Sequence, residues 1–320
     1  DCPGRKKRGG GGMKGLTKLI VGIAAPLFLV GVVLSGVGWA MGAETSIEVP
    51  VGEERIHVGW DGVGLTGWSS SYVIDTAVVE DMALSPFTTL DIELPNGTVP
   101  VSSGETSGIR LSSGSRKLQY SLEDGTLKVW DEELIGVQLS ERGGSVEIFL
   151  PDGAELADAD ITNSLGSIEL KNISAETLTA EADLGDITAD GLRADSATLT
   201  AECGAVNLTS VEADELETDL SLGDMTATGL AITDRLTVTN DMGGVSLEGE
   251  LAEKVSVTAD MGDISAVSSR AEQWYGYELS TDMGEITVNG QSRGVSVSQK
   301  GGEGTMELHT DMGGITVRFS

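Results

Sequence analysis

Carboxylate side chains that flank a repeated glycine are the residues of this sequence whose types and spacing could bind a ligand. Stacked in register, they would form a column of like charges about 5 Å apart, and like charges that close repel unless a cation screens them. Calcium takes six to eight oxygen ligands and could bridge such a column. The candidate metal ligands are Asp241, Asp260, Asp263, Asp282, Glu285 and Asp311.

A second interpretation of these carboxylates needs no ligand. Asp beside Gly is common in turns, because its short side chain accepts hydrogen bonds from nearby backbone. The calcium-binding nonapeptide Gly-Gly-x-Gly-x-Asp is absent, and the series is interrupted near Cys203 and at Ser221. We favour turn formation, with weak Ca²⁺ binding as the alternative, and we expect no other cofactor.

The glycines define the elements that position these carboxylates. They stand at positions 166, 185, 204, 223, 243, 262, 284 and 313, and most steps between them are 19 or 20 residues. A fixed period of this length is typical of a solenoid, in which each repeat forms one coil stacked on the last. We expect residues 151–320 to form one continuous coil with these glycines in a single column.

Apolar and polar residues alternate within each repeat, which indicates β-strands with one buried face. The alternation is clear at Leu178, Ala180 and Ala182, and it resumes at Ile187. Helical spacing of apolar residues is absent, and residues 151–270 contain no Phe, Tyr or Trp, so the core must be aliphatic. The sequence therefore predicts an all-β fold, a single-chain β-solenoid (β-helix or β-roll) with coils of about 19–20 residues.

We expect about three apolar columns inside the solenoid. One follows the glycines by seven residues, and a second directly precedes each glycine. The members of the second column are Leu165, Leu184, Cys203, Leu222, Met242, Met261, Met283 and Met312. If this column fills the core, Leu184→Asp should destabilise the fold far more than Asp186→Ala, because it places a charge in a dry interior.

One step between glycines is longer and contains three aromatic residues, Trp274, Tyr275 and Tyr277. Insertions in solenoids form loops, often on the binding face, and aromatic rings there could stack on a sugar or grip a partner. Trp274 and Tyr275 are therefore candidate ligand contacts. The alternative, which we favour, is that Tyr277 is a core residue and Trp274 covers a widened coil.

The N-terminal region predicts export. Residues 19–41 are uncharged and long enough to span a bilayer, and basic residues precede them within 1–18. The positive-inside rule then places the N-terminus in the cytoplasm and the body outside it, on a single-pass anchor at 19–42. A cleaved secretory signal is the alternative. Residues 1–12 are either part of a cytoplasmic stub or an upstream extension that is not native.

Residues 44–150 are β-like but irregular, and they hold most of the aromatic side chains outside the anchor. We expect this region to form a cap for the regular repeats of residues 151–320, because the first coil of a solenoid must be shielded.

The exported part is strongly acidic, since residues 19–320 contain 14 Lys and Arg but 50 Asp and Glu. Nucleic acid is excluded as a partner by the sign of this charge. Polysaccharide-cleaving β-helix enzymes hold a polyanion with positive charge, which is scarce here. His57 and His309 stand at neither metal-ligand nor catalytic-triad spacing. We therefore expect a protein that is not an enzyme.

The order of several motifs resembles the putative-adhesin domain family of bacteria. These motifs are residues 90–97, 118–129 and 146–154, followed by the Leu-Gly-Asp-Ile repeats, so that the resemblance covers residues 85–320. It implies an extracytoplasmic, membrane-tethered β-solenoid of unknown function, with an adhesive, structural or envelope-stress-related role. The partner would be a cell-surface glycan or an envelope protein. The alternative is a polysaccharide-binding or polysaccharide-cleaving β-helix protein.

Overall fold

The computed structural model describes residues 46–51, 54–59, 62–66, 78–113, 118–131 and 144–320. The chain divides into two units, Asp1–Tyr72 with Ile135–Leu139 and Val73–Leu134 with Ser140–Ser320. In the first unit, three strands form an antiparallel sheet: β1 (Ser46–Val51), β2 (Glu54–Gly59) and β3 (Gly62–Thr66). The expected anchor at 19–42 and the basic segment at 1–18 lie outside the described residues. Within the described ranges, no helix is long and apolar enough to cross a bilayer.

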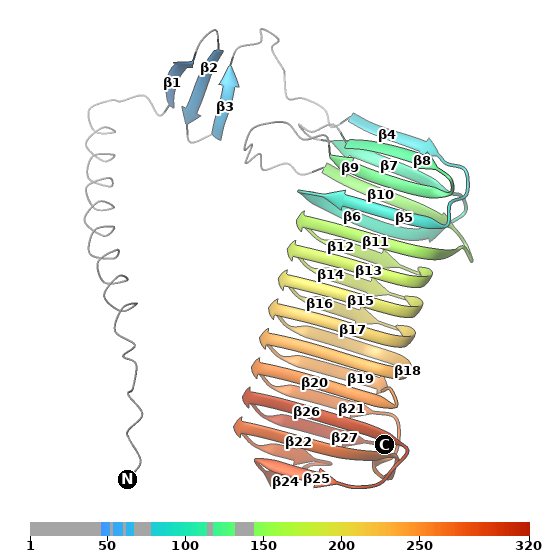
Figure 1. Cartoon of the computed structure of the whole chain (residues 1–320), viewed down its shortest axis with the longest axis vertical. Coiled ribbons are helices and arrows are strands. Elements are labelled where there is room, and N and C mark those ends of the chain that lie inside the picture. Colours follow the sequence, from blue (N-terminus) through green and yellow to red (C-terminus); the bar gives the residue numbers. More distant parts are fainter. Residues whose placement is uncertain (1–45, 52–53, 60–61, 67–77, 114–117, 132–143) are drawn as a thin grey trace, which may run out of the picture. The chain divides into compact units, whose positions relative to one another are not determined.

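The second unit is a β-solenoid, as predicted (Figure 1). Each regular coil has a long and a short strand, and each strand pairs in parallel with its equivalent one coil further on. These strands are β11 (Glu155–Leu165), β12 (Ile168–Lys171), β13 (Ser174–Leu184), β14 (Ile187–Asp190), β15 (Arg193–Cys203), β16 (Val206–Thr209), β17 (Glu212–Leu222), β18 (Met225–Met242), β19 (Val245–Glu250), β20 (Lys254–Met261) and β21 (Ile264–Ser268). Strand β18 contains the short strand of one coil and the long strand of the next.

The interior is aliphatic and follows the predicted alternation. Leu178, Ala180 and Ala182 are buried on one side of the coil and Ile187 on the other. The column seven residues after the glycines is also buried, and its members are Ile173, Leu192, Val211 and Leu230. Full burial of a Leu, Ile or Val side chain stabilises a fold by about 1.5–3 kcal/mol, so these repeated columns are the main source of stability.

The motif glycines form one column because each coil passes very close to the next. A Cβ on Gly243 would lie 1.9 Å from the carbonyl oxygen of Gly223, and a Cβ on Gly262 would lie 1.9 Å from that of Gly243. Real side chains do not approach a backbone atom so closely. The column begins earlier than the sequence suggested, since a Cβ on Gly166 would lie 1.6 Å from the oxygen of Gly97.

Buried polar side chains donate hydrogen bonds to the carbonyl oxygens of this glycine column. Asn163 Nδ2 donates a hydrogen bond of 2.9 Å to the Gly97 oxygen, and Asn240 Nδ2 donates one of 3.0 Å to that of Gly223. Near the C-terminus, Thr310 and Thr281 donate in the same way to Gly262 and Gly313. Because an unpaired buried carbonyl is costly, these side chains stabilise the tight turn from inside.

At the C-terminal end, the coils do not stack in sequence order. Strands β26 (Gly304–Met312) and β27 (Ile315–Phe319) lie between β20–β21 and the preceding coil, which is formed by β22 (Tyr275–Met283) and β23 (Ile286–Val288) (Figure 1). After β23 the chain turns back, and the consecutive segments β24 (Gln291–Gly294) and β25 (Ser296–Gln299) run antiparallel along β23 and β22. The expectation of one continuous coil is therefore wrong in its order here. Coils with the same alternation and glycine position can pair with one another, and the returning segment of β24 and β25 covers the edge of the last coil.

At the N-terminal end of the solenoid, strands that are distant in sequence also stack on one another. Strands β5 (Thr89–Leu94) and β6 (Gly97–Gly104) already form a coil that stacks on β11 and β12. The strands beyond it are β4 (Val78–Ala83), β7 (Gly108–Ser113), β8 (Leu118–Glu123), β9 (Thr126–Asp131) and β10 (Gly144–Pro151), with both parallel and antiparallel pairings. Regular stacking thus includes residues 89–104, inside the region that the sequence assigned to the cap.

Candidate functional site

The apolar column that directly precedes the motif glycines lies on the surface. Its seven Leu and Met side chains are between 40% and 63% exposed, and Cys203 is a half-buried free thiol. The expectation that this column fills the core is therefore wrong. The strand period would point Leu184 inward after Ala182, but the chain turns at Gly185 and directs Leu184 outward. The inward alternation resumes only at Ile187.

These side chains form one continuous row, which we call the Leu/Met ladder. Each member pairs in register with the next, at the ordinary strand spacing of about 4.8 Å. The order in space is Leu165, Leu184, Cys203, Leu222, Met242, Met261, Met312 and Met283. Single exposed apolar residues are ordinary on protein surfaces, whereas contiguous apolar patches mark interaction sites.

Carboxylates border the ladder on both sides. Just before the ladder, Asp241, Asp260, Asp311 and Asp282 occupy successive layers and are exposed. Just after the glycines, the carboxylates instead bind backbone. Backbone N–H groups of the adjacent coil donate hydrogen bonds to their Oδ1 atoms: Ala205 N–H to Asp186 (2.8 Å), Gly244 N–H to Asp224 (2.8 Å) and Gly314 N–H to Asp263 (2.6 Å).

The six candidate metal ligands are therefore divided between two columns. Asp263 is engaged with Gly314 N–H, and Glu285 accepts a hydrogen bond from Ser292. In the part of the chain that the structure describes, no group of three or more His, Cys, Asp or Glu side chains is arranged to hold a metal ion. Asp186, Asp224 and Asp263 therefore link each coil to the backbone of its neighbour, which is a structural role that needs no ligand.

Carboxylates also crowd the outer face at the N-terminal end of the stack. Partial burial raises the pKa of Asp160, and the nearby charges of Asp91 and Asp158 raise it further. Lys128 Nζ lies 2.7 Å from Asp91 Oδ2, and this hydrogen bond raises the pKa of the Lys128 ammonium.

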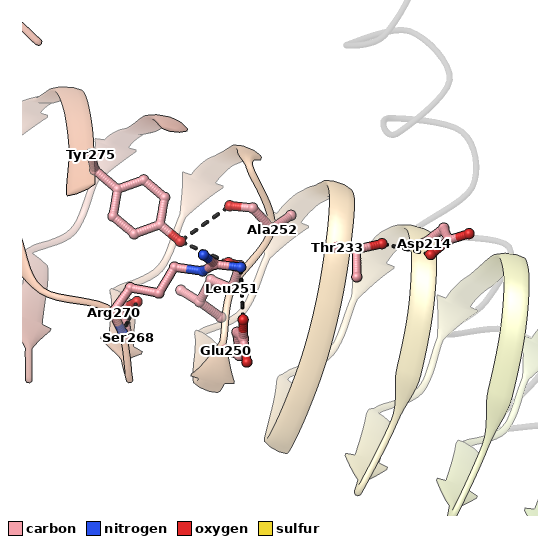
Figure 2. Close-up of polar contacts among 8 residues, drawn as sticks. All are labelled: Asp214, Thr233, Glu250, Leu251, Ala252, Ser268, Arg270 and Tyr275. Atoms are coloured by element: carbon pink, nitrogen blue, oxygen red, sulfur yellow. Dashed lines mark hydrogen bonds and ion pairs between the residues drawn. The ribbon is translucent and has the colours of Figure 1, made fainter. Parts of the chain in front are cut away.

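The aromatic insertion closes a widened coil. Tyr275 is fully buried, and its hydroxyl donates to the carbonyl oxygens of Leu251 (2.8 Å) and Ala252 (3.1 Å) (Figure 2). Burial raises the pKa of this hydroxyl. Tyr275 therefore cannot stack on a ligand, and its proposal as a ligand contact is wrong. Tyr277 is also buried, as the alternative interpretation expected.

Trp274 is only partly buried, but the guanidinium of Arg270 lies 4.0 Å from the centre of its ring. Arg270 is held in turn by an ion pair of 2.7 Å with Glu250 (Figure 2). Because a cation already occupies one face of the indole, Trp274 is better described as a cover for the coil than as an open stacking platform.

One polar arrangement was not expected from the sequence. Ser280 Oγ lies 2.9 Å from His309 Nδ1, and His309 Nε2 lies 3.0 Å from Asp311 Oδ1. Ser280 and His309 are 29 residues apart but are paired on β22 and β26. A serine hydrolase also needs donors that stabilise an oxyanion beside the serine. These three side chains lie on an open sheet face, where the contact serves as a cross-strand hydrogen-bond chain.

The family model described as Toastrack DUF4097 matches residues 87–318. This match confirms the resemblance that the motifs of residues 85–320 indicated. No curated protein sequence matches the chain at a significant level.

Solved structures with a similar arrangement are distant in sequence. A "putative cell adhesion protein" from Clostridium sporogenes is 13% identical with a TM-score of 0.28, over 77% of this chain and 100% of that one. A "putative adhesin" from Bacteroides fragilis is 12% identical with a TM-score of 0.35, over 77% and 97%. A "putative lipid binding protein" from Parabacteroides distasonis is 10% identical with a TM-score of 0.40, over 76% and 96%. Likeness at this level does not identify what this chain binds.

Proposed function

The chain belongs to the Toastrack DUF4097 family, and we propose that its solenoid is a non-catalytic adhesive surface, tethered outside the cytoplasm by an anchor at residues 19–42. The Leu/Met ladder is the observation that supports an adhesive role. An isolated solenoid of this acidity needs no apolar row on its surface, yet seven stacked coils each expose a large apolar side chain. A partner that covers the row would remove this apolar area from water.

The energy available from the ladder is sufficient for recognition. Full burial of a Leu or Met side chain contributes about 1.5–3 kcal/mol, so covering the exposed half contributes roughly 0.7–1.5 kcal/mol per residue before the costs of association. The partner surface should be apolar at its centre and basic at its rim, because Asp241, Asp260 and Asp282 border the ladder. An envelope protein with such a surface is the partner that these features favour.

Substitution within the ladder should separate adhesion from folding. We expect Leu184→Ser/Leu222→Ser/Met261→Ser to remain folded, with a melting temperature moderately below that of the parent, because each of the three side chains is 40–51% exposed. Binding of the full chain to cells of the producing species, measured by flow cytometry, should fall at least about tenfold.

The control for this experiment is Thr209→Ala/Thr226→Ala/Thr228→Ala, which alters three exposed residues on the short strands. It should bind as the parent does. If the ladder variant and the parent bind equally well, the Leu/Met ladder is not the adhesive surface.

The tether is supported by the uncharged segment at 19–41 and the basic residues before it. Alkaline phosphatase, which is active only after export, should be active when fused after Ser320, and the fusion should remain in carbonate-washed membranes. Deletion of residues 19–42 should abolish both properties. Phosphatase activity that is released in soluble form would instead favour a cleaved signal, and an inactive fusion would contradict export.

A further inference from the structure

A shallow groove lies on the outer face of the long-strand sheet, across β18, β20 and β26. Its volume is about 290 Å³, and its lining includes Arg235, Thr237, Lys254, Ser256, Thr305 and Glu307. The basic side chains come from neighbouring strands, since Arg235 pairs in register with Lys254. Two adjacent cations are unusual on a body with a net charge as negative as this one.

Neither cation has a partner within the part of the chain that the structure describes. Other basic residues are engaged in ion pairs, namely Lys128 with Asp91, Lys171 with Glu169, Arg193 with Glu212 and Arg270 with Glu250. No hydrogen bond or ion pair joins Arg235 or Lys254 to a described residue, although Glu215 pairs with Arg235 in the strand register. Their donors are therefore free for a ligand.

The two strands that carry the cations continue with hydroxyl side chains rather than carboxylates on their outward face. The outward residues that follow Arg235 and Lys254 on their strands are Thr237, Thr239, Ser256 and Thr258. Carboxylates lie on the strands at either side, at Glu215 and Glu217 on β17 and at Glu307 on β26. Within the groove, two positive charges and three hydroxyl groups face a single carboxylate, that of Glu307.

We propose that this groove binds an oxyanion, the carboxylate, sulfate or phosphate group of an anionic ligand. Arg235 would contact two oxygens of the anion in bidentate geometry, and Lys254 would supply a second positive charge. The hydroxyls of Thr237, Ser256 and Thr305 would donate the remaining hydrogen bonds. The groove is open and small, which suits one charged sugar unit of an acidic polysaccharide or a free inorganic oxyanion. The inference is independent of the Leu/Met ladder.

Isothermal titration calorimetry on the full chain tests the proposal. The probes are sodium sulfate, sodium phosphate, galacturonate and polygalacturonate, each at ionic strength matched with sodium chloride, and neutral dextran is the blank. We expect Arg235→Gln/Lys254→Gln to weaken oxyanion binding at least about tenfold. Glu307→Gln should strengthen it, because it removes the one carboxylate in the groove.

The matched control is Arg193→Gln/Lys171→Gln, which removes the same charge from exposed ion pairs elsewhere on the solenoid. It should bind as the parent does. Sulfate or phosphate binding that exceeds that of the sugars would identify a free ion as the ligand, and stronger binding of the polymer would identify a polysaccharide. Absence of binding by all four probes, or equal loss in the control variant, would overturn the proposal.

Discussion

Replacement of Gly243 by alanine is expected to prevent folding or to lower the free energy of unfolding by more than about 4 kcal/mol. The added Cβ would lie 1.9 Å from the carbonyl oxygen of Gly223, and 3.2 Å from Asn240 Nδ2. Relief of this clash requires two coils to separate. That separation would break the hydrogen bond that Gly223 N–H donates to the Met242 carbonyl oxygen. The backbone of Gly243 also has a φ of 145°, which L side chains rarely adopt.

The neighbouring glycine supplies the control. A Cβ on Gly244 would make only ordinary contacts, at 3.6 Å from Asp224 Oδ1 and 3.7 Å from the Asp263 oxygen. Alanine already occupies this position in another coil, at Ala205. We therefore expect Gly244→Ala to change stability by less than about 1 kcal/mol. Urea unfolding of the two variants, followed by circular dichroism, compares them. Similar stability for both would contradict the close approach of the coils.

The second large loss of stability is expected when a charged side chain replaces a buried residue of the core. Ile187→Asp should cost about 3–5 kcal/mol or prevent folding, because Ile187 is 0% exposed and the aliphatic core offers the carboxylate no partner. Leu184→Asp should cost less than about 1 kcal/mol, because Leu184 is 51% exposed and its replacement remains in water. This reverses the effect that the sequence alone predicted for Leu184.

Thermal unfolding of the two aspartate variants is the measurement. Both add one carboxylate to the same turn, on either side of Gly185, so their change in net charge is equal. A melting temperature for Leu184→Asp as low as that for Ile187→Asp would show that the ladder is buried. The premise of the proposed adhesive surface would then be lost.

Order along the stack could not be predicted from the repeats. The coils that end at Met261, Met283 and Met312 have the same alternation and the same glycine, so any of them can pair with any other. In the structure, the returning segment at residues 291–299 pairs with one edge of the coil of β22 and β23, and β26 takes the place between β22 and β20. Gly97 was missed for a related reason, because it stands 69 positions before Gly166, which is far outside the 19-residue period.

The glycine period could not predict which side chains are available to bind a ligand, because this depends on the contacts that each side chain makes in the folded protein. Arg235 and Lys254 stand one 19-residue period apart, so the repeat places them in adjacent coils, but it could not show that no described carboxylate pairs with either cation. Tyr275 is a candidate ligand contact by composition, but its hydroxyl finds two buried carbonyl partners in the preceding coil. Ser280, His309 and Asp311 likewise meet through pairing across strands.

The sequence by itself determined the solenoid, because a fixed glycine period and alternating aliphatic residues leave only one way to bury the apolar columns and pack adjacent backbones. It also determined the inward columns, such as Ile173 and Leu192, and it predicted an anchor that lies outside the described residues. Only the tertiary structure decided which apolar column faces water. Alternation holds while a strand continues, but a turn at glycine redirects the residue before it, and composition cannot show on which side of the turn the core lies.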